Sequence, residues 1–244
     1  MSAPVGFGGA RQRGISLLVV MIVVLLSSLL ALWAFRSSLV NEAIVGNDAD
    51  YQRAFEAAQA MIQDAEMDIR GERADGALCT VDGANLKVCR SEPTAAFINE
   101  NKDLGALLSR LQNEGPRNTG CLNAICLKRV GIQDFWSDKD VFDAMTAANV
   151  GARYGEYTGA TFPADSKANA NPLLAETRAG LGAWYWIEIM PYDASPAGLM
   201  ASQPKMELNL NPNVVYRITA VARGLKPRTQ VVLQSAFVRQ KLRN

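Results

Sequence analysis

The sequence predicts an α+β fold in which a long N-terminal helix packs on a C-terminal antiparallel sheet. Three observations carry this prediction: an uncharged apolar run over residues 15–35, an amphipathic helical pattern over residues 36–70, and strand patterns in the last third of the 244-residue chain. We therefore expect four parts: a leader over residues 1–14, the two helix halves, and a globular head over residues 71–244.

The apolar run has the length and composition of a membrane-spanning helix. It contains 21 uncharged residues, interrupted only by Ser16, Ser27 and Ser28. At roughly 1.5 Å per helical residue it spans about 31 Å, the thickness of the hydrocarbon core of a bilayer. Arg11 and Arg13 precede the run, and acidic residues follow it. Because short basic flanks stay in the cytoplasm, we expect a single-pass anchor with the head outside.

Residues 36–70 continue the helix with an apolar stripe on one side. The stripe is formed by residues that recur at steps of three or four positions: Phe55, Ala58, Ile62, Ala65 and Ile69, widened by Ala54, Ala57 and Met61. This pattern predicts that the stripe lies on the head and that polar residues, Asp64 among them, lie on the other faces. Gly71 is the expected C-terminal stop.

The strands of the head are expected at residues 184–191, 214–223 and 229–239, because these segments are rich in β-branched and aromatic residues. The five residues 224–228 suit a hairpin connection between the last two strands. Alternation in the middle strand places four residues toward the helix: Tyr216, Ile218, Ala220 and Ala222.

The sequence between the helix and these strands is harder to interpret. Short helices are expected over residues 104–111 and 139–148, and an exposed loop over residues 151–172, which are rich in Gly, Ala, Asn and Ser.

Four cysteines lie in this segment: Cys79, Cys89, Cys121 and Cys126. Outside the cytoplasm an even number of cysteines favours disulfides, and four cysteines allow three pairings. Short loops favour Cys79–Cys89 with Cys121–Cys126. A zinc site formed by all four thiolates is the alternative, although the spacing is not that of zinc knuckles.

Few catalytic mechanisms fit this composition, and we expect no enzyme and no cofactor. The chain has no histidine, which excludes Ser-His-Asp and Cys-His catalysis and zinc sites that depend on histidine. The net charge of +1 argues against a nucleic-acid partner. Two weaker candidates are a calcium site at Asp134, Asp138, Asp140 and Asp143, where an acidic helix N-terminus is the favoured interpretation, and a ligand groove at Trp184, Tyr185 and Trp186.

The junction before the apolar run resembles the prepilin leader of type IV pilins and type II secretion pseudopilins, because Arg13-Gly14 stands directly before Ile15. The resemblance implies that prepilin peptidase cuts between Gly14 and Ile15, and that Ile15 becomes the N-methylated first residue. Those families usually have Glu at the fifth mature position, where this chain has Val19. A carboxylate in the bilayer costs roughly 2.5–3.5 kcal/mol and needs a partner, so Val19 suits a subunit with none above it.

The helical region resembles more closely the PilX-type minor pilins of the type IV pilus. The residues that carry this are Gly46-Asn47, then Ala54-Phe55-Glu56-Ala57-Ala58, then Asp64-Ala65-Glu66; the last two strands are similar as well. The resemblance implies a pilin-like fold and a place in the tip complex that primes pilus assembly. It implies an inner-membrane location with a periplasmic head, and later a place at the pilus tip on the cell surface.

The implied partners are other minor pilins, a tip adhesin, the major pilin, prepilin peptidase, the inner-membrane assembly platform and membrane lipid. Two alternatives remain at this point. One is the K-type pseudopilin of type II secretion, which also lacks the Glu. The other is an uncleaved bitopic periplasmic binding or sensor protein.

Overall fold

The computed structural model describes residues 15–80, 87–91, 93–161, 170–192 and 212–239. The chain divides into two compact units, Met1–Asp48 and Ala49–Asn244. The predicted leader, residues 1–14, lies outside the described residues.

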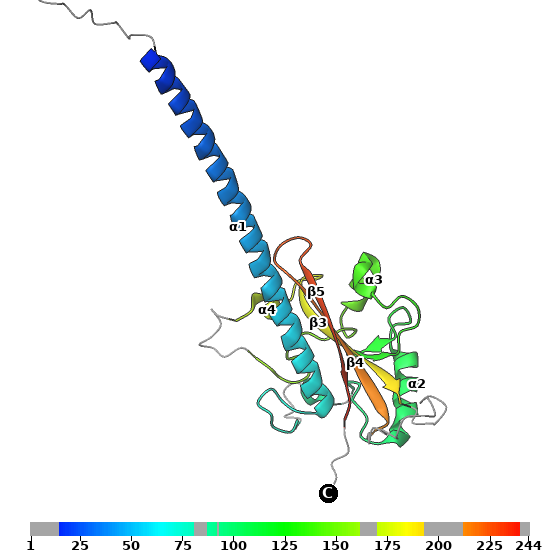
Figure 1. The fold of residues 1–244 in the computed structure, drawn as a ribbon. Helices are drawn as coiled ribbons and strands as arrows, with labels where there is room; N and C mark the ends of the chain where they lie inside the picture. The colour runs from blue at the N-terminus through cyan, green and yellow to red at the C-terminus, as the bar shows by residue number, and fades with distance from the viewer. Residues whose placement is uncertain (1–14, 81–86, 92, 162–169, 193–211, 240–244) are drawn as a thin grey trace, which may run out of the picture. The chain divides into compact units, whose positions relative to one another are not determined.

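Helix α1, Ile15–Arg70, is 56 residues long and supplies the described part of the first unit and the first element of the second (Figure 1). It ends where the sequence predicts. Gly71 has a φ of 68°, its N–H donates to the carbonyl of Asp68 at 3.1 Å, and the N–H of Glu72 donates to the carbonyl of Met67 at 2.9 Å. These two hydrogen bonds form a Schellman motif, for which glycine is the favoured residue.

Among the described residues, the head has a five-stranded sheet in the order β1-β2-β3-β4-β5. The strands are β1 Cys121–Leu122, β2 Ile125–Leu127, β3 Gly182–Pro191, β4 Val214–Arg223 and β5 Gln230–Phe237. The three strands expected late in the chain are confirmed as β3, β4 and β5, and the α+β class is confirmed. The expectation of a purely antiparallel sheet is wrong at one place, because β2 pairs with β3 in parallel.

The parallel pair follows from a long crossover between β2 and β3, which the sequence did not reveal. Parallel neighbours cannot be joined by a tight turn, so the chain must return to the start of the sheet before β3 begins. The returning segment contains the 3₁₀ turn η3, Phe135–Ser137, and the helices α3, Lys139–Met145, and α4, Pro172–Ala175.

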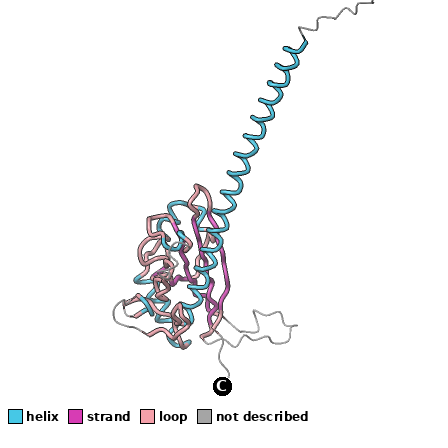
Figure 2. Tube along the Cα trace, turned by 90° about the vertical axis from the view of Figure 1, so that its left-hand side faces the viewer, coloured by secondary structure: helices cyan, strands magenta, loops and turns pink. Residues whose placement is uncertain are grey.

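Both faces of the sheet are covered, one by the last part of α1 and the other by the part of this crossover that contains η3 and α3 (Figure 2). We call them the helix face and the crossover face. The helix face includes Ala54, Ala57, Ala58, Met61 and Ala65 of α1 with Tyr216, Ile218, Ala220 and Ala222 of β4, so the predicted orientation of β4 is confirmed. The crossover face includes Phe135, Phe142, Met145, Trp184 and Trp186.

Three shorter helical elements complete the described head: η1, Val88–Arg90, η2, Asn101–Asp103, and α2, Leu104–Glu114. The helix predicted over residues 104–111 is confirmed as α2, and that over residues 139–148 is confirmed as α3, which ends earlier, at Met145.

Three expectations about burial are wrong. Residues 151–161 are not an exposed loop, because Gly151, Ala152, Tyr157, Thr158 and Ala160 are buried, while residues 162–169 lie outside the described ranges. The Trp184–Trp186 segment does not form a surface groove, because alternation sends its three fully buried rings to opposite faces of the sheet. Asp64 belongs to the buried side of α1 and not to its polar side.

Candidate functional site

The first unit contributes an apolar helical surface. Residues 15–35 carry no charge, and their large side chains are exposed in the isolated chain. The hydroxyl groups of Ser27 and Ser28 donate to the carbonyls of Val23 and Val24 at 2.7 and 2.8 Å, so these polar groups are satisfied within the helix itself. Helix α1 contains the one stretch, among the described residues, that is long and apolar enough to cross a membrane. This half of α1 therefore fits a single-pass membrane anchor.

Of the predicted processing site, Ile15 is the residue that the structure describes. Gly14 is outside the described residues, and Ile15 is the first residue of α1. Val19 lies one turn further along with 49% of its surface exposed, among apolar neighbours. The helix thus presents an alkyl side chain at the fifth position of the predicted mature chain.

In the head, α1 is joined to three loops by three buried aspartates that sequence reasoning missed. Asp50, Asp64 and Asp68 are separated by 14 and 4 positions, close to whole numbers of helical turns, so they share one face. Alanines dominate the positions between them on that face. The small side chains bring the helix backbone close to the head, and the buried carboxylates accept hydrogen bonds from donors in the loops.

Asp50 holds the connection between β4 and β5. Its two carboxylate oxygens accept hydrogen bonds from the backbone N–H groups of Leu225 and Lys226 at 2.9 and 3.0 Å. Burial acts to raise the pKa of Asp50, but these bonds, with Thr229 and the charge of Arg53, hold that pKa below its usual value. A side chain at position 224 would meet Asp50, since a Cβ built on Gly224 lies 2.3 Å from the carboxylate.

Asp64 holds the segment before α4. Its carboxylate accepts from the backbone N–H of Gly155 at 2.8 Å and from the hydroxyl of Thr158. Asp64 is fully buried, and burial raises its pKa to about 6 despite these two hydrogen bonds.

Asp68 holds the loop that carries the first disulfide. Arg90 binds both oxygens of Asp68, through Nε at 2.6 Å and Nη2 at 2.5 Å, and the hydroxyl of Tyr185 donates to Oδ2 at 2.7 Å. The guanidinium also lies over the ring of Tyr157 at 3.8 Å. Burial opposes the charge of Arg90, but the ion pair with Asp68 raises the pKa of Arg90 above its usual value.

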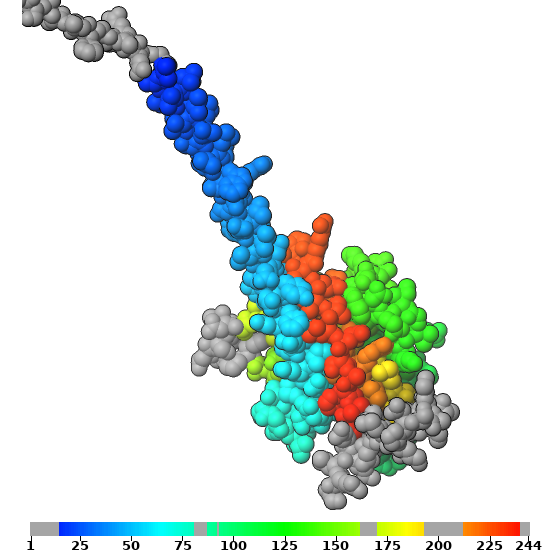
Figure 3. All heavy atoms as spheres, viewed as in Figure 1, coloured from blue at the N-terminus to red at the C-terminus, as the bar shows by residue number. Residues whose placement is uncertain are grey.

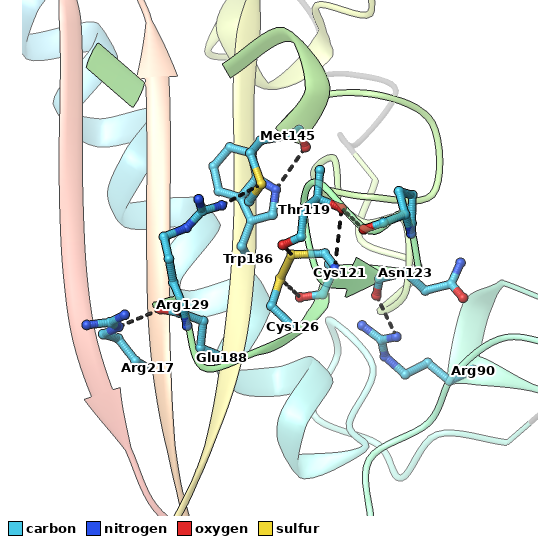
Figure 4. The surroundings of a disulfide bond; sticks show 12 residues. Arg90, Thr119, Cys121, Asn123, Cys126, Arg129, Met145, Trp186, Glu188 and Arg217 are labelled. Atoms are coloured by element: carbon cyan, nitrogen blue, oxygen red, sulfur yellow. Dashed lines mark hydrogen bonds and ion pairs between the residues drawn. A yellow bond between two sulfur atoms is a disulfide. The ribbon is translucent and has the colours of Figure 1, made fainter. Parts of the chain in front are cut away.

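Both disulfides favoured by the sequence are present, and each fixes a loop near this ion pair. Cys79–Cys89 ends directly before Arg90. Cys121–Cys126 closes the β1–β2 hairpin around Asn123, whose carbonyl accepts from Arg90 at 2.9 Å (Figure 4). A zinc site at these residues is therefore not formed.

The acidic cluster considered for calcium has other contacts. Asp138 is the N-cap of α3 and accepts from the N–H groups of Asp140 and Val141 at 2.9 and 3.0 Å. Asp143 pairs with Lys139 at 2.5 Å. In the part of the chain that the structure describes, no group of three or more His, Cys, Asp or Glu residues could hold a metal ion.

Two family models match the chain. The model described as Type IV pilus assembly protein PilX C-term matches residues 99–239, and the model described as PilX N-terminal matches residues 13–63. No curated protein and no solved structure matches at a significant level. The first match covers more than half of the chain and includes every strand of the sheet, and the second covers the apolar run and most of the alanine-rich face. The chain therefore belongs to the PilX family of type IV pilus assembly proteins and is a minor pilin of the type IV pilus.

Proposed function

We propose that this minor pilin belongs to a complex that primes pilus assembly and stays at or near the tip of the fibre. The observation that carries the proposal is Val19. A carboxylate at this depth would need a cationic partner, which a subunit above would supply through its N-terminal amine. An alkyl side chain needs no such neighbour, so this subunit can be the first to leave the membrane.

Processing and topology form part of the same proposal. Prepilin peptidase removes residues 1–14, and Ile15 becomes the methylated first residue of a mature chain that remains anchored in the inner membrane. The head lies in the periplasm, an oxidising compartment in which the two disulfides persist. Intact-mass measurement on the membrane-bound protein tests this, and a chain that retains residues 1–14 in a piliated host would contradict it.

The proposed role is mechanical and not catalytic. During assembly the apolar half of α1 exchanges lipid contacts for contacts with neighbouring helices. The partners are other minor pilins, a tip adhesin, the major pilin and the inner-membrane assembly platform. The three aspartate contacts support this role, because they link the pulled helix to loops throughout the head.

Replacement of Val19 provides the test. We expect Val19→Glu to bring no gain in fibre number, because the new carboxylate finds no amine above it and carries an insertion cost of roughly 2.5–3.5 kcal/mol. Val24→Glu is the matched control, since it adds the same charge to the span outside the fifth position. Deletion of the protein should lower the fibre count far more than it changes fibre structure.

The readouts are fibre count by electron microscopy and the position of labelled subunits on each fibre. Label spread evenly along the shaft, or a rise in shaft incorporation specific to Val19→Glu, would contradict a role restricted to the tip.

A further inference from the structure

The edge strand β5, as placed in the described sheet, carries little in its own sequence that protects a sheet edge from pairing. In the described sheet, β5 pairs with β4 on one side and has no strand on the other. Its eight residues, Gln230–Phe237, include no charged residue and no proline. Natural proteins usually protect an exposed edge with charges, prolines, bulges or very short strands, because the unpaired N–H and C=O groups accept another strand. An unprotected edge of this length is therefore competent to bind an extended chain.

A groove runs beside this edge. Its apolar floor suits the side chains on one face of an added strand. The groove has a volume of about 470 Å³ and lies between α1 and β5, which lie side by side on the surface of the head (Figure 3). Phe55 and Ile62 of α1 and Leu233 of β5 give it an apolar floor. Ser235 follows Leu233 in the row of β5 side chains that faces α1, and its small size leaves the space open.

We propose that β5 receives an extended segment of a neighbouring pilus subunit, which adds a sixth strand to the sheet and places an apolar side chain in the groove over Ser235. This inference deepens the proposed function and rests on it for the identity of the neighbour. Backbone hydrogen bonds to β5 would supply affinity, and the groove would select alternate apolar side chains.

The polar residues at the rim of the groove restrict which partner segments can bind there. Among the described residues that line the groove, Glu66 is the only charged one, and its carboxylate lies 3.8 Å from the guanidinium of Arg70. The described lining itself carries no cation, so an acidic side chain in the groove would lose hydration without a partner, and an uncharged or basic segment is favoured.

A second copy of this chain does not fit the edge. Symmetric pairing of two β5 strands is antiparallel, and it would reverse one head relative to the other. Within each head, residues 49–70 of α1 run along the helix face, so these helical segments of the two copies would point in opposite directions. The proposed function has all subunits leave one membrane in the same orientation, so a different subunit is the favoured occupant.

The experiment measures amide hydrogen exchange on the full-length chain in detergent, alone and in the co-purified minor-pilin complex. In an antiparallel edge strand alternate N–H groups point outward, so we expect about half of the amides of β5 to become protected in the complex. Residues 128–134, an exposed loop at the other side of the sheet, should not change. Complex formation with no added protection in β5 would overturn the proposal.

A matched pair of substitutions tests the groove. Ser235→Glu places a charge in the groove near Glu66, whereas Ala236→Glu places the same charge on the opposite side of the same strand, opposite Arg217. We expect Ser235→Glu to lower recovery of the complex at least tenfold and Ala236→Glu to leave it within twofold. Formation of both disulfides and equal protein levels show that each variant folds. Equal effects of the two variants on recovery would contradict the proposal.

The variant Ser235→Cys identifies the occupant by cross-linking in piliated cells. A cross-link to an extended segment of another pilus subunit supports the proposal, and a cross-link to a second copy overturns it. Fibre count separates the two proposals: if deletion lowers fibre number but β5 gains no protection, priming stands and strand addition fails.

Discussion

The two faces of the sheet are buried by different means. On the helix face, alanines of α1 let two backbones approach closely, and three aspartates and one arginine are buried among them. On the crossover face, large rings fill the space: Phe135, Phe142, Trp184 and Trp186 make edge-to-face contacts with centroids 4.9–6.3 Å apart. The helix face is specified mainly by directional polar contacts, and the crossover face mainly by the volume of its packed rings.

Under the proposed mechanical role, in which force acts on α1, this difference between the faces has a consequence. Aromatic packing tolerates small shifts, because most of its contacts are dispersion contacts that are individually weak. A carboxylate that accepts two backbone N–H groups, or both arms of a guanidinium, fixes position and orientation. The helix face therefore couples α1 to the head, and the crossover face supports the sheet from behind. The substitutions below test this division.

The largest effect is expected from Arg90→Met. This change leaves the carboxylate of Asp68 buried without its cation, a loss that typically costs about 3–5 kcal/mol of stability. The matched change on the crossover face is Arg217→Met. Arg217 also binds a carboxylate, Glu188, at 2.5 Å, but the Arg217 side chain is 26% exposed and Glu188 keeps a hydrogen bond from the backbone N–H of Arg129 at 2.8 Å, so the loss of Arg217 should cost clearly less stability than the loss of Arg90.

Urea unfolding of the full-length chain, followed by tryptophan fluorescence, measures both variants. The double variant Arg90→Met, Asp68→Leu should recover part of the stability, because the unpaired charge is then gone. Equal losses for Arg90→Met and Arg217→Met would show that the two faces do not differ as described.

The second prediction concerns pH, to which the helix face should be sensitive through Asp64. Burial raises the pKa of Asp64 to about 6 in the folded chain from an unfolded value of 3.8. The folded state therefore binds the proton more tightly, and its stabilisation is complete below pH 3.8 and is lost as pH rises through about 6. The difference between the two pKa values corresponds to about 3 kcal/mol of folding stability, at 1.36 kcal/mol per pKa unit.

Asp64→Asn should remove this dependence and raise stability at pH 7.5. An asparagine oxygen can accept from the N–H of Gly155, and its amide can donate to the hydroxyl of Thr158, so both contacts persist. Phe142→Leu on the crossover face is the control: it should lower stability by the same amount at pH 5 and pH 7.5. If wild type and Asp64→Asn gave parallel stability curves from pH 4 to 8, Asp64 would not titrate as described.

The sequence predicted the elements whose signals are local. The apolar run, the stop at Gly71 and the alternation in β4 each depend on residues close together in the chain. Both disulfides close short loops, with separations of 10 and 5 residues, and are favoured for the same reason.

The features that the sequence did not reveal depend on contacts between residues that lie far apart in the chain. Asp64 contacts Gly155 and Thr158, which lie 91 and 94 positions away, and a helical pattern counts an aspartate as solvent-exposed unless such partners are known. The predicted stripe was therefore centred too far toward Phe55 and Ile62, which lie at the margin of the interface. The parallel β2–β3 pair was missed because a three-residue strand followed by an irregular crossover has no period to detect.

The smallest effect expected is from a single methyl group on the crossover face. A Cβ at Gly151 would lie 2.7 Å from Nε1 of Trp186 and 3.1 Å from the carbonyl of Met145, the two groups joined by a 3.0 Å hydrogen bond. Gly151→Ala should therefore force these groups apart and cost about 1–3 kcal/mol, the usual range for overpacking.

Gly105→Ala in α2 is the matched control for this substitution. Among the described residues, no atom beyond the neighbouring backbone of α2 lies within 4 Å of a Cβ at that position, and alanine favours a helix over glycine by about 0.5–1 kcal/mol, so this change should be neutral or stabilising. Urea midpoints and near-UV circular dichroism of the tryptophans measure both variants. If the aromatic rings can shift slightly, the loss of stability should stay near about 1 kcal/mol. A loss above about 3 kcal/mol would show that the crossover face is as directional as the helix face, and an unchanged midpoint would show that Trp186 does not pack against Gly151.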